Sequence, residues 1–347
     1  MRAHVTMIVA CSLLSVWPGK LAGQTAASVP GTQASQPGLS VVLASQEAAT
    51  KTAEPDKTAS IVSVVRALGD VAALTEEEQD VLVEGLYLAY GVDRSRENLA
   101  KLRKALGDIR TASKASGKMG QRCQALAAQF GVLDLDDFHR MCDARNNVSM
   151  VVRLSYADML GRVGQFDDAI KILTGEHSTS DFSFLQDRGI RALYGAMRRK
   201  GEEDGKAAVS IYRASAECLQ MDMAYCEDVI RGIRRLYRHR GLSAEQTANL
   251  ANIEIGVARS LLRQRDSVAH GAIGYALLKD VRSHLGSPMG LNSAERDKLL
   301  AACEEMDSHV ETMKKANMAV AHQESTPKFC VRVLTVGEYK AVEMEGK

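Results

Sequence analysis

The sequence predicts an all-α protein built from stacked antiparallel helix pairs, and three observations favour this fold class. The 347 residues include only 6 prolines and 5% aromatic residues, whereas helix-forming residues occur throughout. Apolar residues recur at the spacing of amphipathic helices. Glycine or small polar residues separate segments of helical length. We expect the helical domain to cover residues 58–322, followed by a tail over residues 323–347.

The N-terminus resembles an export signal. Arg2 precedes the apolar run "VTMIVACSLLSVW", which is too short to span a bilayer. We therefore predict a cleaved signal peptide over residues 1–23, with a periplasmic or secreted bacterial protein as the product. A lipid anchor on Cys11 is the alternative, because the residues before it resemble a bacterial lipoprotein box. Residues 24–57 are rich in Thr, Ala, Ser, Gln and Pro, which indicates a disordered linker.

Charge and length restrict the function classes. The net charge is +1, and removal of residues 1–23 takes away two basic residues and no acidic one, leaving about −1. A globally basic nucleic-acid binder is therefore disfavoured. A chain of this length can bury a large core without a cofactor, and we predict none. No stretch after the signal is long and apolar enough to be a transmembrane segment.

Helices are expected on both sides of a central repeated region. Thr75 and Glu78 have the spacing of a capping box at the start of one helix, and Ser293 is expected to open a long capping helix. The expected helices cover residues 60–74, 75–91, 94–114, 119–131, 243–267, 269–286 and 293–323.

Two segments of the central region share a pattern of helix, glycine turn and helix. In "RLSYADMLGRVGQFDDAIKIL" the turn falls at Gly164, and in "ALYGAMRRKGEEDGKAAVSIYRASAECL" it falls at Gly201. Small residues such as Ala157 and Ala207 let paired helices approach closely, and stacked pairs bury a shared core.

These residues carry a family resemblance over about residues 150–240. The first segment resembles a tetratricopeptide repeat, and the second resembles a Sel-one-like repeat, although the valine usual after the turn glycine is missing. The resemblance implies a right-handed α-solenoid that binds a protein or peptide partner. The matching residues are Ala157, Leu160, Gly164, Phe166 and Ala169 in the first segment and Gly195, Gly201, Lys206, Ala207, Ala208 and Tyr212 in the second.

Cys218 and Cys226 are separated by seven residues. In exported, cysteine-rich members of the resembled family, this spacing commonly links one repeat to the next through a disulfide. From the residues alone, a disulfide and two buried thiols remain open, whereas zinc and redox motifs would need closer spacing. The pairing of the other cysteines after Cys11 is equally open; they are Cys123, Cys142, Cys303 and Cys330.

Signals for catalysis or metal binding are few, and we predict neither. The resemblance suggests one enzymatic alternative, a hydrolase acting on the cell wall or on β-lactams, which would need Ser-x-x-Lys at a helix start. The single match runs from Ser325 to Lys328 and contains a proline. Acidic residues at Asp134, Asp136 and Asp137 suggest a helix N-terminus more than calcium or glycosidase chemistry.

Arginines provide the candidate binding residues. Arg231, Arg234, Arg235 and Arg238 fall at helical spacing in "VIRGIRRLYRHRG". Guanidinium groups suit carboxylate, phosphate or sulfate groups. The alternative is a solvated helix face balanced by acidic neighbours. A second basic cluster includes Arg198 and Arg199. We therefore expect a non-catalytic exported scaffold whose solenoid surface binds a protein or peptide partner, with an acidic peptide as one candidate.

The C-terminal tail has a different pattern. In "KFCVRVLTVGEYKAVEM" apolar and polar residues alternate as in strands. We expect a β-hairpin turning near Gly337 or an extended tail. A structural or assembly subunit that self-associates through these strands is the third possible function.

Overall fold

The computed structural model divides the chain into two units, residues 1–55 and 56–347, and all described residues belong to the second unit. The predicted signal peptide, Cys11 and the predicted linker lie outside them. No helix in the described part combines the length and apolar character needed to cross a membrane. The described residues are 59–66, 68, 70–116, 118–143, 148, 150–174, 186–201, 203–237, 242–263, 268–285, 291–320 and 326–345.

All regular secondary structure in this described part is helical, which confirms the all-α prediction. The helices, in chain order, are α3 (Ala59–Arg66), the 3₁₀ turn η1 (Val71–Ala73), α4 (Glu76–Val92), α5 (Arg96–Ser116), α6 (Gln121–Gln129), α7 (Leu135–Asp143), α8 (Met150–Arg162), α9 (Phe166–Thr174), α10 (Gln186–Arg199), α11 (Asp204–Tyr237), α12 (Ala244–Arg263), α13 (Val268–Leu285), α14 (Ser293–Glu304), α15 (Asp307–Val320), α16 (Pro327–Val336) and α17 (Glu338–Glu345).

Local sequence signals account for several helix ends. The capping box at Thr75 and Glu78 is present at the start of α4. The expected helix over residues 60–74 is instead α3 followed by η1, because the Asp70 side chain accepts a hydrogen bond from the backbone N–H of Ala72 and starts a separate turn. The expected long helix after Asn292 is likewise divided into α14 and α15.

The two predicted helix–turn–helix units are present. Gly164 lies between α8 and α9 with φ of 83°, and Gly201 lies between α10 and α11 with φ of 85°. This left-handed backbone region favours glycine, which explains why both turns contain it. The sequence pattern therefore located both turns correctly.

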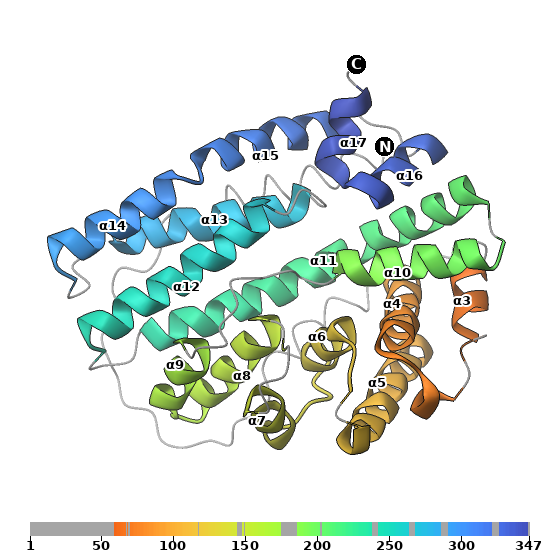
Figure 1. Cartoon of the computed structure of the whole chain (residues 1–347), viewed down its shortest axis with the longest axis horizontal. Coiled ribbons are helices and arrows are strands. Elements are labelled where there is room, and N and C mark those ends of the chain that lie inside the picture. The colour runs from red at the N-terminus through yellow and green to blue at the C-terminus, as the bar shows by residue number, and fades with distance from the viewer. Residues whose placement is uncertain are drawn as a thin grey trace. The chain divides into compact units, whose positions relative to one another are not determined.

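Helix α11 is the central element. It packs against α4, α8 and α16, which come from distant parts of the sequence, as well as against α12 and α13. In Figure 1, α11 crosses the middle of the molecule, with α12 to α15 drawn above it and α4 to α9 below. A regular stack, in which each helix pair contacts only its neighbours along the chain, is not confirmed.

The Cys218–Cys226 disulfide that the family resemblance implies is wrong. Both cysteines lie on α11, which runs unbroken from Asp204 to Tyr237 because no proline or glycine separates them. Eight residues of α-helix span about 12 Å, whereas a disulfide needs Cα atoms within about 7 Å. Cys218 is a fully buried thiol whose Sγ lies 3.6 Å from the carbonyl oxygen of Tyr87.

The predicted β-like tail is also wrong, because α16 and α17 occupy it. Thr326 caps α16 and Pro327 takes the first helical position. The buried side chains of α16 recur at helical spacing, and one of them, Phe329, meets Tyr212 of α11 edge to face with ring centroids 6.0 Å apart. The strands on which the self-association hypothesis depended are therefore absent from residues 326–345.

Candidate functional site

Ion pairs direct the arginines of α11, which were predicted to form one binding face, towards different helices. Arg234 pairs with Asp280 of α13, whereas Arg235, the next residue, pairs with Asp158 of α8. The Arg234 side chain is 17% exposed. Two of the four arginines thus hold α11 to helices in different directions. The side chain of Arg231 and the whole of Arg238 lie outside the described residues.

The second basic cluster lies at the end of α10, next to α4. Arg198 pairs with Asp204, and its guanidinium carbon lies 5.8 Å from the ring centroid of Tyr194. Arg199 lies 3.7 Å from Glu77 of α4, with both side chains about two-thirds exposed. Arg199 therefore faces α4 and Arg198 faces the start of α11, whereas Arg234 and Arg235 face α13 and α8.

A cavity of about 430 Å³ lies beside Arg199, among α3, α4 and α10. Apolar side chains and charged groups of both signs line it. The Nζ of Lys200, another lining residue, donates to the carbonyl oxygen of Ser63 over 3.0 Å. The lining residues are Val64, Leu68, Thr75, Glu77, Glu78, Val81, Ala196, Arg199 and Lys200.

The acidic residues at the start of α7 have a structural role. Asp134 and Asp137 each accept a hydrogen bond from the other's backbone N–H, which caps α7, and Asp137 also pairs with Arg110 and Arg140. Ser325 lies outside the described residues, and Lys328 is exposed on α16.

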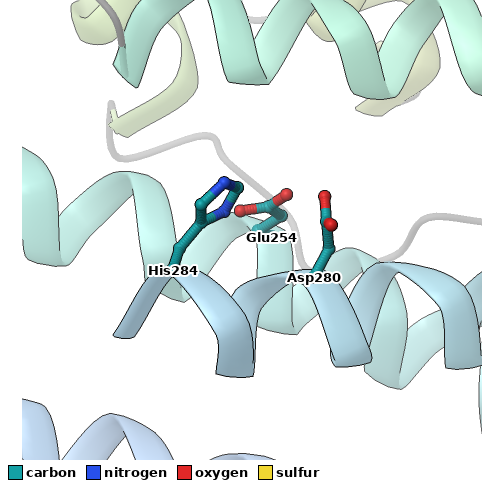
Figure 2. A group of neighbouring side chains, drawn as sticks. All are labelled: Glu254, Asp280 and His284. Carbon is teal, nitrogen blue, oxygen red and sulfur yellow. The ribbon is translucent and has the colours of Figure 1, made fainter. Parts of the chain in front are cut away.

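A buried polar group that no sequence motif predicted lies between two helices. Glu254 of α12 lies close to Asp280 and His284 of α13, and one ligand atom from each falls within 4.8 Å of the other two. Figure 2 shows the Glu254 carboxylate between the imidazole of His284 and the carboxylate of Asp280. Within the described part of the chain, no other three His, Cys, Asp or Glu residues meet this criterion.

Close packing of α12 and α13 sets this geometry. A Cβ on Gly274 would lie 2.9 Å from the Cβ of Leu261 and 3.0 Å from the carbonyl oxygen of Ala258, so the helices touch almost backbone to backbone. Glu254 lies one turn before Ala258, on the face that packs against α13. Asp280 and His284 are four residues apart and therefore share a face of their helix.

Burial perturbs the titration of this group. The Glu254 side chain is 1% exposed. Burial raises the pKa of Glu254 to about 7, with a further increase from Asp280, against the opposing effects of the Arg234 charge and the Tyr237 hydroxyl. The pKa of Tyr237 lies well above its usual value because the phenol is buried and Glu254 is near.

One sequence signal could have revealed the group. Glu254 interrupts an apolar series in α12, where neighbouring positions such as Leu250, Ile255 and Leu261 are buried. A charged residue at a core position of an amphipathic helix needs a buried partner, an ion or a proton. The partners themselves could not be identified, because their proximity depends on the register between α12 and α13.

No protein-family model, no curated protein and no solved structure matches the chain. The resemblance to tetratricopeptide and Sel-one-like repeats therefore remains an expectation from the residues. Because α11 continues unbroken past Cys218 and Cys226, the spacing of these cysteines does not support that resemblance.

Proposed function

We propose that this protein is a non-catalytic helical scaffold that binds an extended peptide segment of a protein partner. The cavity among α3, α4 and α10 is the observation that carries the proposal. Its volume of about 430 Å³ lies within the range of ligand pockets and suits an inserted apolar side chain. Val64, Leu68, Val81 and Ala196 supply the apolar part of the lining.

The charged residues around the cavity favour an acidic group next to the inserted side chain. Arg199 is well exposed and lies 3.7 Å from Glu77, a loose surface pair that contributes little to stability. A carboxylate of the partner can replace Glu77 on the guanidinium at small cost. This assigns the expected binding role to Arg199 rather than to Arg234 and Arg235, whose ion pairs join α11 to neighbouring helices. Arg198 lies next to Arg199 but already pairs with Asp204.

The wider setting of the proposal comes from sequence. Export to the periplasm or secretion is inferred from residues 1–23, and a linker is inferred from the composition of residues 24–57. The helix pairs that turn at Gly164 and Gly201 support a relation to solenoid repeats, whose surfaces bind proteins in the resembled families.

The proposal is tested with peptides selected from a displayed library on the protein lacking residues 1–57. We expect binders with an apolar residue flanked by an acidic residue. Ala196→Trp should fill the cavity and abolish binding, and Arg199→Glu should weaken it at least about tenfold, with weaker binding as salt rises. Ala301→Trp, on the exposed face of α14, is the matched control. Binding unchanged by both cavity variants would exclude this site.

A further inference from the structure

We propose that Glu254, Asp280 and His284 form a binding site for a divalent first-row transition-metal ion of the Zn²⁺ type. The site is distinct from the peptide cavity, which lies among other helices. Three protein ligands are available, one imidazole nitrogen and two carboxylate oxygens, within 4.8 Å of one another. A four-coordinate ion would keep one position for water or an external ligand.

The buried state of Glu254 is the independent observation that points to a cation. Glu254 is 1% exposed, and neither of its carboxylate oxygens accepts a hydrogen bond of ordinary length and angle, although the Tyr237 hydroxyl is close enough to favour the charged form. The Nδ1 of His284 is also buried without a hydrogen-bond partner. Native proteins rarely leave such groups unsatisfied, and each one needs an explanation. A metal ion seated between them would satisfy both at once.

The surrounding charges are compatible with this occupant. Arg234 pairs with Asp280, so it neutralises one of the two carboxylates and leaves the other for the ion. A carboxylate has two oxygens, and Asp280 can keep its contact with Arg234 through one while the other binds metal. Outer partners of this kind orient metal ligands.

The ligand types select the class of ion. An imidazole together with carboxylates suits Zn²⁺, Mn²⁺, Fe²⁺ or Co²⁺, whereas Ca²⁺ and Mg²⁺ prefer oxygen ligands alone. The ligand atoms lie within 4.8 Å of one another. Ligands bound about 2.0–2.2 Å from one zinc ion would lie closer together than this limit. A small rotation of the side chains therefore accompanies binding. Glu254 comes from α12, while Asp280 and His284 come from α13, so bound metal would join the two helices.

Titration calorimetry with Zn²⁺ alone, on untagged protein freed of metal, tests the proposal. We expect one ion per chain, little competition from Ca²⁺, and a rise in melting temperature with Zn²⁺ concentration. Glu254→Gln and His284→Gln should each reduce affinity at least about tenfold. Glu245→Gln, an exposed acid on the same helix, and His139→Gln on α7 are the matched controls and should bind normally.

Co²⁺ absorption separates this site from the buried cysteines. Co²⁺ held by nitrogen and oxygen gives weak visible bands without the thiolate charge-transfer band that cysteine ligation produces. If Glu254→Gln fails to fold, the His284→Gln spectrum and titration decide. The proposal fails if Zn²⁺ does not bind, if a thiolate band appears, or if His284→Gln binds as tightly as the His139→Gln control.

Discussion

Gly91 of α4 lies directly against Cys218 of α11, so closely that a Cβ on Gly91 would overlap the Cys218 Sγ. The contact explains why a fully buried cysteine occupies this position. Its thiol fills the space above the glycine and points at the carbonyl oxygen of Tyr87, 3.6 Å away. Cys218 is therefore a packing residue where α4 meets α11.

This contact predicts that Gly91→Ala destabilises the protein by about 1–3 kcal/mol, the usual cost of overpacking. Gly107→Ala is the control, because no atom lies within 4 Å of the Cβ position at Gly107 of α5. There alanine should stabilise by about 0.5–1 kcal/mol. Urea unfolding measures both. Adding Cys218→Ala to Gly91→Ala should recover part of the loss, and the absence of any recovery would contradict the assigned contact.

Peptide mapping without a reducing agent tests whether Cys218 and Cys226 form a disulfide. We expect no Cys218–Cys226 linkage, even after mild oxidation, because α11 holds their Cα atoms about 12 Å apart. Alkylation after unfolding should label both thiols. A linked peptide would show that α11 is broken between Asp204 and Tyr237 in solution.

Local patterns predicted much of the fold. Gly164, Gly201 and the Thr75–Glu78 capping box each involve residues a few positions apart, so the sequence contains the whole signal. The C-terminal tail was ambiguous, because the apolar residues Phe329 and Val333 fit both an alternating strand and a helix face. Packing against α11 decides between them.

The candidate sites depended on tertiary structure. The helical spacing of the α11 arginines predicted a shared face, but adjacent positions such as Arg234 and Arg235 point about 100° apart. Their acidic partners lie on α13 and α8, so the two side chains reach different helices. Glu254 meets Asp280 and His284 only through the register of two packed helices. Sequence spacing predicts which residues share a helix face. Whether that face is exposed to solvent or paired inside the protein depends on residues of other helices.

A buried ion pair gives a further prediction. Glu84 of α4 is fully buried, and its Oε1 accepts from the Nη2 of Arg122 of α6 over 3.4 Å, with a second, closer contact from the Nε. The Arg122 guanidinium also lies 5.1 Å from the ring centroid of Tyr87. Removing one charge would leave the other buried without its partner.

We therefore expect Arg122→Met to destabilise the protein by about 3–5 kcal/mol. The double change Glu84→Gln with Arg122→Met should restore much of this loss, because no unpaired charge remains. Lys101→Met, which breaks the exposed pair with Glu97, should change stability by less than about 1 kcal/mol. Urea unfolding of all three variants at pH 7 tests the assignment. A double variant no more stable than Arg122→Met would contradict it.

His270 of α13 makes the folding stability fall as the pH drops below neutrality. Its side chain is 1% exposed, and burial, together with the positive charge of Arg122, lowers its pKa from 6.5 to about 4. The unfolded chain binds this proton at higher pH than the folded chain does. The stability from neutral His270 is thus complete above pH 6.5 and is lost as the pH falls towards 4.

The expected loss is on the order of 3 kcal/mol at pH 4, measured as the pH dependence of the urea midpoint. His270→Leu removes the titrating group and should flatten the profile between pH 6.5 and 4, whereas His309→Gln on α15 should leave its slope unchanged. If the His270→Leu profile falls as steeply as that of the unmodified protein, other groups cause the acid sensitivity. Because Arg122 contributes to the shift, Arg122→Met should also raise the pKa of His270 and make the fall in stability at acid pH shallower.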